Sequence, residues 1–327
     1  MFAKNVTSLL ASAIVLAAAT AAGTGTAPAQ TYPSKLIKIV IPVTPGSPVD
    51  VKARLLAPLL QANLGQTVIV ENRPGAGGTI GIKAVATAEP DGHTLLLHSA
   101  SFATASAAYP NLGYDPIKDF APVSTLGTSY WYVVVPAPLP VKTLAEFVSS
   151  SKANPGTLNF GFGLASTPHV LGEAFKVISG ADFASIPYRG GAPAIADMLG
   201  GRVHLNFGTP ATLLPLIRDG KIRAIATTNA TRSADLPDVP TMAEAGFPRL
   251  TATFWTGVMA PAGTPAAVVA RLNAAIHASV KTPEMQVGMA RTGFDTLLSA
   301  PQEFAATIAS DIEKWSALIK LSGVKIE

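Results

Sequence analysis

The stretch Lys38-Ile39-Val40-Ile41-Pro42-Val43, followed by Thr44-Pro45-Gly46-Ser47-Pro48-Val49-Asp50, decides the predicted fold of this chain. A second stretch repeats the design, because Thr67-Val68-Ile69-Val70 precedes Glu71-Asn72-Arg73-Pro74-Gly75-Ala76-Gly77-Gly78. Each is a β-branched apolar run that suits a strand buried on both faces, followed by a small-residue loop and a helical pattern. Such a loop directs backbone N–H groups and the positive end of a helix into the space above the strands. We therefore expect a parallel sheet whose strand ends bind an anion.

The alternation of strands and helices continues along the chain. After a helix over residues 79–88 and a strand over 94–98, residues 99–108 read as a loop over the sheet edge, and 114–116 open a connecting region. A strand over 130–135 restarts the rhythm, which runs through helices at 143–153, 167–179, 192–199 and 211–219 and strands at 158–162, 183–187, 203–207 and 222–228. A last strand at 253–259 precedes helices at 265–280, 283–291 and 301–321. Strands alternating with helices predict an α/β fold of two doubly wound lobes joined by a hinge near Tyr132 and Phe254.

The first 29 residues have the pattern of a signal peptide. Lys4 gives a basic start, a small apolar run follows, and Ala27-Pro28-Ala29 has the form of a cleavage site. We expect cleavage after Ala29, export to the periplasm, and no membrane span elsewhere. With no cysteine, the chain can form neither disulfides nor a cysteine-linked lipid anchor. The net charge of +4 comes from scattered lysines and arginines, which argues against nucleic-acid binding.

Three loops of small residues are expected at strand ends that face the gap between the lobes: residues 44–49, 164–168 and 208–211. Ligands of open α/β sheets collect outside the carboxyl ends of the strands, so this placement is informative although each loop alone is a weak motif. The candidate ligand-binding residues are Thr44, Pro45, Gly46, Ser47, Pro48, Ser99, Phe102, Ser166, Thr167, Gly208 and Thr209. A hydroxyl such as that of Ser166 can instead serve only as a helix cap.

Other site types find little support in the sequence. Residues 75–78 lack the spacing of a dinucleotide-binding loop and the Gly-Lys-Ser/Thr of a P-loop, so a tight turn is expected there. Ser166 and His169 lie one helical turn apart, which leaves an exported hydrolase as an alternative, but no nucleophile elbow surrounds the serine. The five histidines show no metal-ligand spacing. We expect neither a metal nor a cofactor, and no catalytic residue.

Short segments spread along the chain resemble one family, the periplasmic solute-binding proteins of tripartite tricarboxylate transporters, of the Bordetella-uptake-gene type. The most specific of them is Glu71-Asn72-Arg73-Pro74-Gly75-Ala76-Gly77-Gly78. The others are Tyr32-Pro33-Ser34-Lys35, Pro90-Asp91-Gly92, Tyr114-Asp115-Pro116, Pro187-Tyr188-Arg189-Gly190, Leu236-Pro237-Asp238-Val239-Pro240 and Ala260-Pro261-Ala262-Gly263-Thr264-Pro265. The resemblance implies a periplasmic binding protein fold of type II, two lobes that close on a small carboxylate held by loop backbone groups and bridging waters, and delivery to a membrane permease without catalysis.

The family's binding loops map onto three segments of this chain. The first, commonly A-P-G-G-S-T-D, falls on residues 44–50, with Ser47 in place of a glycine and Val49 in place of a hydroxyl residue. The second, often G-S-S-P-H, falls on residues 165–169 and keeps its hydroxyls. In the third, a common F-D-N becomes Phe207-Gly208-Thr209, which removes a carboxylate from the site and makes an amino-acid ligand a poorer guess.

These observations predict a receptor for a small carboxylate. We expect a monomeric receptor, and the pattern of strands and helices places lobe 1 at residues 30–131 and 255–327 and lobe 2 at residues 132–254. Phe102, Phe162, Phe207 and Trp255 could line the site, which favours an aromatic mono- or dicarboxylate, although core packing is the commoner role for each ring. A sensor that presents its loaded form to a signalling partner would need the same closure, so the sequence leaves transport and sensing open.

Overall fold

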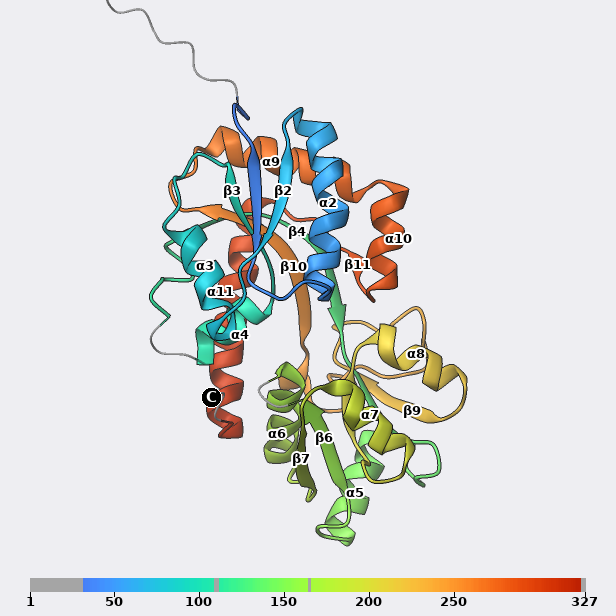
Figure 1. Cartoon of the computed structure of the whole chain (residues 1–327). Coiled ribbons are helices and arrows are strands. Elements are labelled where there is room, and N and C mark those ends of the chain that lie inside the picture. The colour runs from blue at the N-terminus through green and yellow to red at the C-terminus, as the bar shows by residue number, and fades with distance from the viewer. Residues whose placement is uncertain (1–31, 109–111, 164–165, 325–327) are drawn as a thin grey trace, which may run out of the picture. The chain divides into compact units, whose positions relative to one another are not determined.

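The computed structural model describes residues 32–108, 112–163 and 166–324, and the predicted signal peptide lies outside these ranges. Residues from Lys35 onward form one compact unit, to which the following description applies. None of the helices in the described ranges combines the length and the apolar composition needed to cross a membrane. The fold is α/β with mixed sheets (Figure 1).

A six-stranded sheet has the order β11-β4-β10-β3-β1-β2. Its strands are β1 (Ile37–Ile41), β2 (Val68–Asn72), β3 (Thr94–Ser99), β4 (Phe120–Tyr130), β10 (Thr253–Pro261) and β11 (Asp295–Thr296). Strands β2, β1 and β3 are parallel, and β10 runs antiparallel between β3 and β4. The run 38–41 is therefore a central strand, and its residues Ile39, Val40 and Ile41 are almost completely buried, as its apolar composition predicts.

Helices cover both faces of this sheet (Figure 1). On one side lie α2 (Pro48–Leu64), α9 (Ala266–Val280) and α10 (Pro283–Arg291). On the other lie α3 (Thr79–Ala86), α4 (Ser101–Ala108) and α11 (Pro301–Ser322). The alternation of β10 defines the two faces, because Trp255 packs on Phe304 of α11 while Thr256, the next residue, contacts Lys52 of α2.

The middle of the chain forms the remaining strands. A three-stranded sheet has the order β8-β5-β9, and β6 pairs with β7 in parallel. The strands are β5 (Tyr132–Pro136), β6 (Asn159–Gly163), β7 (Ala184–Tyr188), β8 (Asn206–Gly208) and β9 (Ile222–Thr227), with helices α5 (Leu144–Ala153), α6 (Thr167–Ser179), α7 (Gly191–Leu199) and α8 (Pro210–Arg218) between them. Strand β5 is antiparallel to both β8 and β9. The three-stranded sheet therefore contains a strand that runs antiparallel to both of its neighbours, as β10 does in the six-stranded sheet.

The chain passes between the two groups of strands twice. A single residue, Trp131, separates β4 from β5, and the return reaches β10 through Ala252, whose N–H donates to the Thr228 carbonyl at 2.8 Å. Helix α11 contributes Phe304 and Ile308 to the core of the six-stranded sheet and Trp315 and Leu318 to the core that contains β5 and β6. The C-terminal helices therefore cover the first sheet, as expected, and α11 also contacts α6 of the second group.

Two sequence predictions were wrong at the level of elements. Residues 99–108 were expected to be a loop, but 101–108 form α4, whose Phe102 and Ala103 are fully buried. The region after Tyr114 was expected to connect elements, but it contains the eleven-residue strand β4. Pro122 of β4 pairs with Met259 of β10 beside a register shift between Val258 and Met259, and such irregularities are where strands accommodate proline.

Candidate functional site

Three of the candidate loops join a strand to the N-terminus of a helix: β1 to α2, β6 to α6 and β8 to α8. Each helix begins in the same way, with a hydroxyl residue at the N-cap and a proline within the first two positions. The N-caps are Ser47, Ser166 and Thr209. Because the first N–H groups of a helix have no partner within the helix, these ends can donate to an anion.

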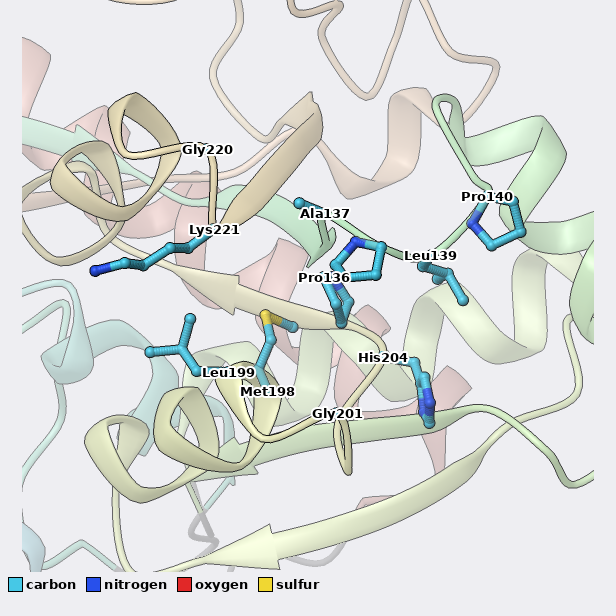
Figure 2. A pocket seen from close by; sticks show the side chains of 11 residues that line it. Pro136, Ala137, Leu139, Pro140, Met198, Leu199, Gly201, His204, Gly220 and Lys221 are labelled. Atoms are coloured by element: carbon cyan, nitrogen blue, oxygen red, sulfur yellow. The ribbon is translucent and has the colours of Figure 1, made fainter.

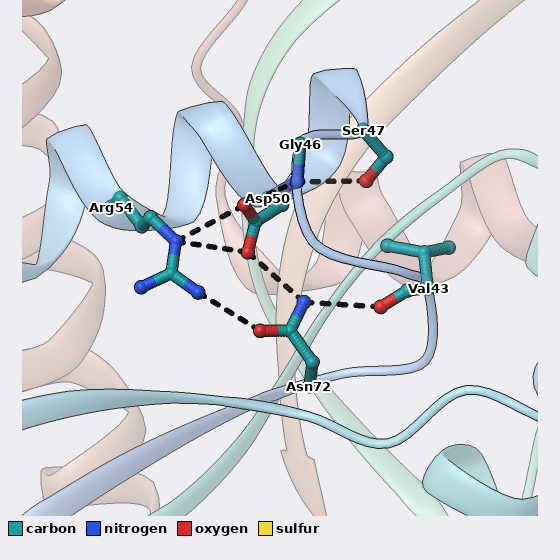
Figure 3. A network of polar contacts seen from close by, with 6 residues as sticks. All are labelled: Val43, Gly46, Ser47, Asp50, Arg54 and Asn72. Carbon is teal, nitrogen blue, oxygen red and sulfur yellow. Dashed lines mark hydrogen bonds and ion pairs between the residues drawn. The ribbon is translucent and has the colours of Figure 1, made fainter.

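The first loop is held by a buried network around Asp50 (Figure 3). The Asp50 carboxylate is almost fully buried and accepts hydrogen bonds from the Gly46 N–H at 2.8 Å, the Asn72 amide at 3.0 Å and Arg54 Nε at 3.0 Å. Asn72 also donates to the Val43 carbonyl and accepts from Arg54, so the carboxylate ties both ends of the loop together. Burial alone would raise the pKa of Asp50, but these hydrogen bonds outweigh it and hold the pKa below its usual value.

Within this network, backbone N–H groups that we expected to bind a ligand are already hydrogen-bonded to the protein. The Gly46 N–H is bonded to Asp50, and the N–H groups of Asp50 and Val51 bond to the side chain and the carbonyl of Ser47. Pro48 has no N–H. The first loop therefore offers a ligand the N–H of Val49 and the hydroxyls of Thr44 and Ser47, while Pro45 and Pro48 shape the turn.

The second loop follows the same plan. Ser166 Oγ donates to the Gly163 carbonyl at 2.6 Å and accepts from the His169 N–H at 3.4 Å, so the hydroxyl caps α6. The N–H of Val170 also bonds to the Ser166 carbonyl, and Pro168 has no N–H. Among the described residues the Thr167 N–H and hydroxyl have no hydrogen-bond partner, so they are available to a ligand, and the side chain of Thr167 is half-buried.

The third loop differs in its hydroxyl. Thr209 makes no cap hydrogen bond and instead lies 3.1 Å from the Thr212 hydroxyl. Gly208 is buried at the end of β8, and a side chain there would collide with Leu213, whose Cδ1 would lie 2.7 Å from the added Cβ. Glycine at this position therefore permits the close packing of α8 on the strand.

Ser99 and Phe102, the remaining candidates, have different surroundings in the structure. Ser99 ends β3, is half-buried, and shares a 2.8 Å hydrogen bond with the Ser101 hydroxyl. Phe102 is fully buried and packs against Phe120 and Tyr114. The other three rings proposed as walls, Phe162, Phe207 and Trp255, are exposed by only 2–3 %. The structure thus places all four aromatic candidates in the hydrophobic cores, where a ligand cannot reach them in this conformation.

The geometry at Ser166 and His169 does not suit nucleophilic catalysis. The serine hydroxyl donates to a carbonyl, and the imidazole stacks on Phe162 with 4.0 Å between ring centroids. Burial lowers the pKa of His169, and its Nδ1 has no hydrogen-bond partner among the described residues. A base for the hydroxyl and a carboxylate bonded to the imidazole are both lacking within those residues. The described part of the chain also contains no cluster of side chains that could hold a metal ion.

A separate hollow of about 690 Å³ lies among residues 136–140, the end of α7 and the start of β9 (Figure 2). Its lining is largely apolar, with His204 and Lys221 as the titratable side chains. It borders Met198 and Leu199, the last residues of α7, so helix carbonyls and the negative end of the helix dipole lie there. This hollow is a poor site for an anion, unlike the three helix N-termini.

Comparisons with known proteins agree with this geometry. Residues 52–324 match the TctC family, described as "Tripartite tricarboxylate transporter family receptor". Three solved structures are similar over most of the chain. Periplasmic binding protein BugD is 34 % identical, with a TM-score of 0.70, and the match covers 90 % of this chain and 99 % of that one.

The other two structures contain carboxylates. MatC (Rpa3494) from Rhodopseudomonas palustris with bound malate is 31 % identical, with a TM-score of 0.70 and coverage of 88 % of this chain and 100 % of that one. R. palustris Rpa4515 with adipate is 32 % identical, with a TM-score of 0.72 and coverage of 89 % and 98 %. The fold is thus that of a periplasmic binding protein, and the family consists of solute-binding receptors and not of enzymes. The chain belongs to the TctC family of tripartite tricarboxylate transporter receptors.

Proposed function

We propose that this protein is a periplasmic receptor that captures a small organic carboxylate and delivers it to the membrane permease of a tripartite tricarboxylate-type transporter. The signal-peptide pattern of residues 1–29 supports export, and family membership supports the transporter as partner. We further propose that residues 30–131 and 255–327 move as one lobe and residues 132–254 as the other, with the receptor acting as a monomer. Two short connections, at Trp131 and Ala252, suit a hinge between them.

The observation that carries the proposal is the shared construction of three helix N-termini. The first two offer a backbone N–H and at least one hydroxyl, and the third offers the Thr209 hydroxyl. The only carboxylate within the described part of these loops and caps is that of Asp50, which is buried and paired. Donors without acceptors suit an anion, and neutral donors suit a receptor that must also release its ligand. We assign ligand contacts to Thr44, Ser47, Ser99, Thr167 and Thr209, with Ser166 positioning the second loop.

The burial of the candidate aromatic rings bears on whether the ligand is an aromatic or an aliphatic acid. The preference for an aromatic acid rested on rings that are buried, so it loses its support. Relatives hold malate and adipate, which are both aliphatic dicarboxylates. We therefore propose an aliphatic dicarboxylate as the ligand.

A thermal-shift screen tests the proposed function. The mature protein would be heated with malate, adipate, succinate, citrate and benzoate, each at a concentration of several millimolar. A ligand at 100 times its dissociation constant stabilises the folded state by about 2.7 kcal/mol, so binding raises the unfolding temperature. We expect a shift with at least one dicarboxylate and a smaller one with benzoate. If no acid stabilises the protein at any concentration up to 10 mM, the proposal is wrong.

A further inference from the structure

Lys52 of α2 is completely buried and has no carboxylate partner among the residues that the structure describes. Its side chain is 0 % exposed, its Nζ lies 3.4 Å from the Thr256 hydroxyl, and it lies 3.1 Å from the centroid of the Phe294 ring. Lysines are almost never fully buried unless they are paired. A ring face and one long hydrogen bond replace only part of the hydration that an ammonium group loses.

The charged groups around α2 do not compensate for this burial. On the elements packed against Lys52 they are Asp50 and Arg54 of α2 itself, Lys38 of β1, Glu71 of β2, His98 of β3, Arg271 and His277 of α9, Glu284 and Arg291 of α10, and Asp295 beside Phe294. None of them influences the pKa of Lys52, which burial alone lowers to about 7. Lys52 thus exchanges a proton near neutral pH in the empty protein.

The position of Lys52 connects it to the candidate site. Side chains of a helix tilt toward its N-terminus, so the ammonium group of Lys52 lies close to the first turn of α2, where the loop at 44–47 ends. Its partner Thr256 is directly opposite Ser99 in the antiparallel pairing of β10 with β3. Residues directly opposite in such a pair have Cα atoms about 5 Å apart and side chains on the same face. Lys52 therefore lies beneath the end of the sheet that carries Ser99, next to the first turn of α2, which follows the loop that contains Thr44 and Ser47.

We propose that Lys52 is a buried counter-charge for the bound carboxylate, acting through the protein interior beneath the loop at 44–47 and Ser99. This inference rests on the proposed function and adds a specificity-determining residue to it. The three loops supply only neutral donors, so a full positive charge a short distance below them favours an anion, and a dianion more than a monoanion. Because the interior screens charge weakly, Lys52 need not touch the ligand.

Proton uptake on binding is the signature of this arrangement. An anion near Lys52 stabilises the ammonium form and raises its pKa, so the complex holds more protons than the empty receptor does between about pH 7 and pH 9. Affinity then falls as the pH rises through this range. A lysine that only fills space in the core would give neither effect.

The test compares wild type with three variants, using malate and adipate as probes. Isothermal titration at pH 7.5, in phosphate and in Tris, gives the number of protons taken up, and titrations at pH 6.5 and 9.0 give the pH dependence. Lys52→Met removes the charge and keeps the volume, and Lys52→Arg keeps a charge that does not titrate. Lys176→Met is the matched control, because Lys176 also lies over a ring, that of Phe183, but on α6.

For wild type we expect uptake of about half a proton at pH 7.5 and an affinity that falls at least tenfold from pH 6.5 to 9.0. Lys176→Met should behave in the same way. Lys52→Met should bind at least tenfold more weakly at pH 6.5 and lose both proton uptake and pH dependence, whereas Lys52→Arg should bind at pH 9.0 as well as at pH 6.5.

Two results would overturn the inference and leave the proposed function intact: equal affinities of Lys52→Met and wild type at both pH values, or binding to wild type without proton uptake. The second needs no variant, so it applies even if a variant fails to fold. If neither these probes nor any acid of the screen binds wild type, the proposed function fails and this inference fails with it.

Discussion

Replacing Lys52 by methionine should stabilise the empty protein, and the gain should depend on pH. Burial lowers the pKa of Lys52 from 10.5 to about 7. Each pKa unit corresponds to about 1.4 kcal/mol, so the buried lysine costs the folded state about 5 kcal/mol at pH 7. Methionine has nearly the same length and no charge, and it gives up a cation–π contact with Phe294 worth about 1–2 kcal/mol. The expected net gain is about 3 kcal/mol.

The sign of the pH effect follows from the two states. In the unfolded chain Lys52 stays protonated up to about pH 10.5, while in the folded chain it is neutral above about pH 7. Between these values the unfolded state binds more protons, so the stability of wild type rises with pH by up to about 1.4 kcal/mol per unit, and methionine abolishes this contribution. The advantage of Lys52→Met should therefore be largest at pH 7 and shrink steadily toward pH 10.

Urea unfolding followed by tryptophan fluorescence at pH 7, 8, 9 and 10 measures this difference, and every other titrating group cancels between the two proteins. Lys176→Met again serves as the control, since Lys176 is half-buried and donates to the Phe183 carbonyl at 2.7 Å. It should show no such pH-dependent gain. A stability difference that stays constant from pH 7 to pH 10, or a Lys52→Met protein that is less stable than wild type at pH 7, would refute the reasoning.

Other predictions concern the three loops. Asp50→Asn should lower the free energy of unfolding by about 2–3 kcal/mol at pH 7. Since the pKa of Asp50 is held below its usual value, this stabilisation is lost as the pH falls through the lowered pKa, and urea titrations of the two proteins should converge toward acid pH. Ser166→Ala should cost about 1 kcal/mol through loss of the α6 cap, and an unchanged melting temperature would contradict the capping role. Thr209→Val, which removes no cap bond, should change stability by less than about 0.5 kcal/mol yet weaken malate binding in calorimetry; wild-type affinity would remove Thr209 from the site.

Much of the fold is predictable from the sequence because local signals agree with the tertiary structure. Helices α6 and α10 begin and end at the residues that the sequence indicates, since Ser166 and Thr282 cap them and prolines follow within the first turn. Helix α4 has no such signals. Its small residues form no apolar stripe, and burial of Phe102 and Ala103 against the sheet stabilises it, which a local pattern does not reveal.

The sequence predicts where the loops of the site lie. It does not predict which of their backbone N–H groups remain free to bind a ligand. Strand–loop–helix patterns locate the loops at 44–47 and 208–209, whereas the use of the Gly46 N–H depends on how the Asp50 carboxylate folds back. An aspartate three residues after a serine cap gives a partial signal, because that position commonly bonds back to the cap region. The burial of Lys52 gives no sequence signal at all, since a lysine in the second turn of a helix ordinarily faces water.

The hydroxyl groups at the three helix N-termini have two different roles: some cap their helix, and one is free to contact a ligand. The hydroxyls of Ser47 and Ser166 cap their helices, so they fix loop geometry whether or not a ligand is present. The Thr209 hydroxyl makes no cap bond and can turn toward a ligand, which makes the third loop the natural place for a contact formed only in the complex. Each helix end contributes roughly half a positive charge, weakened by solvent, against the two full charges of a dicarboxylate. The donors can therefore orient such a ligand more readily than they can neutralise it, and the remaining compensation has to come from a full charge nearby, for which Lys52 is the group in the right place.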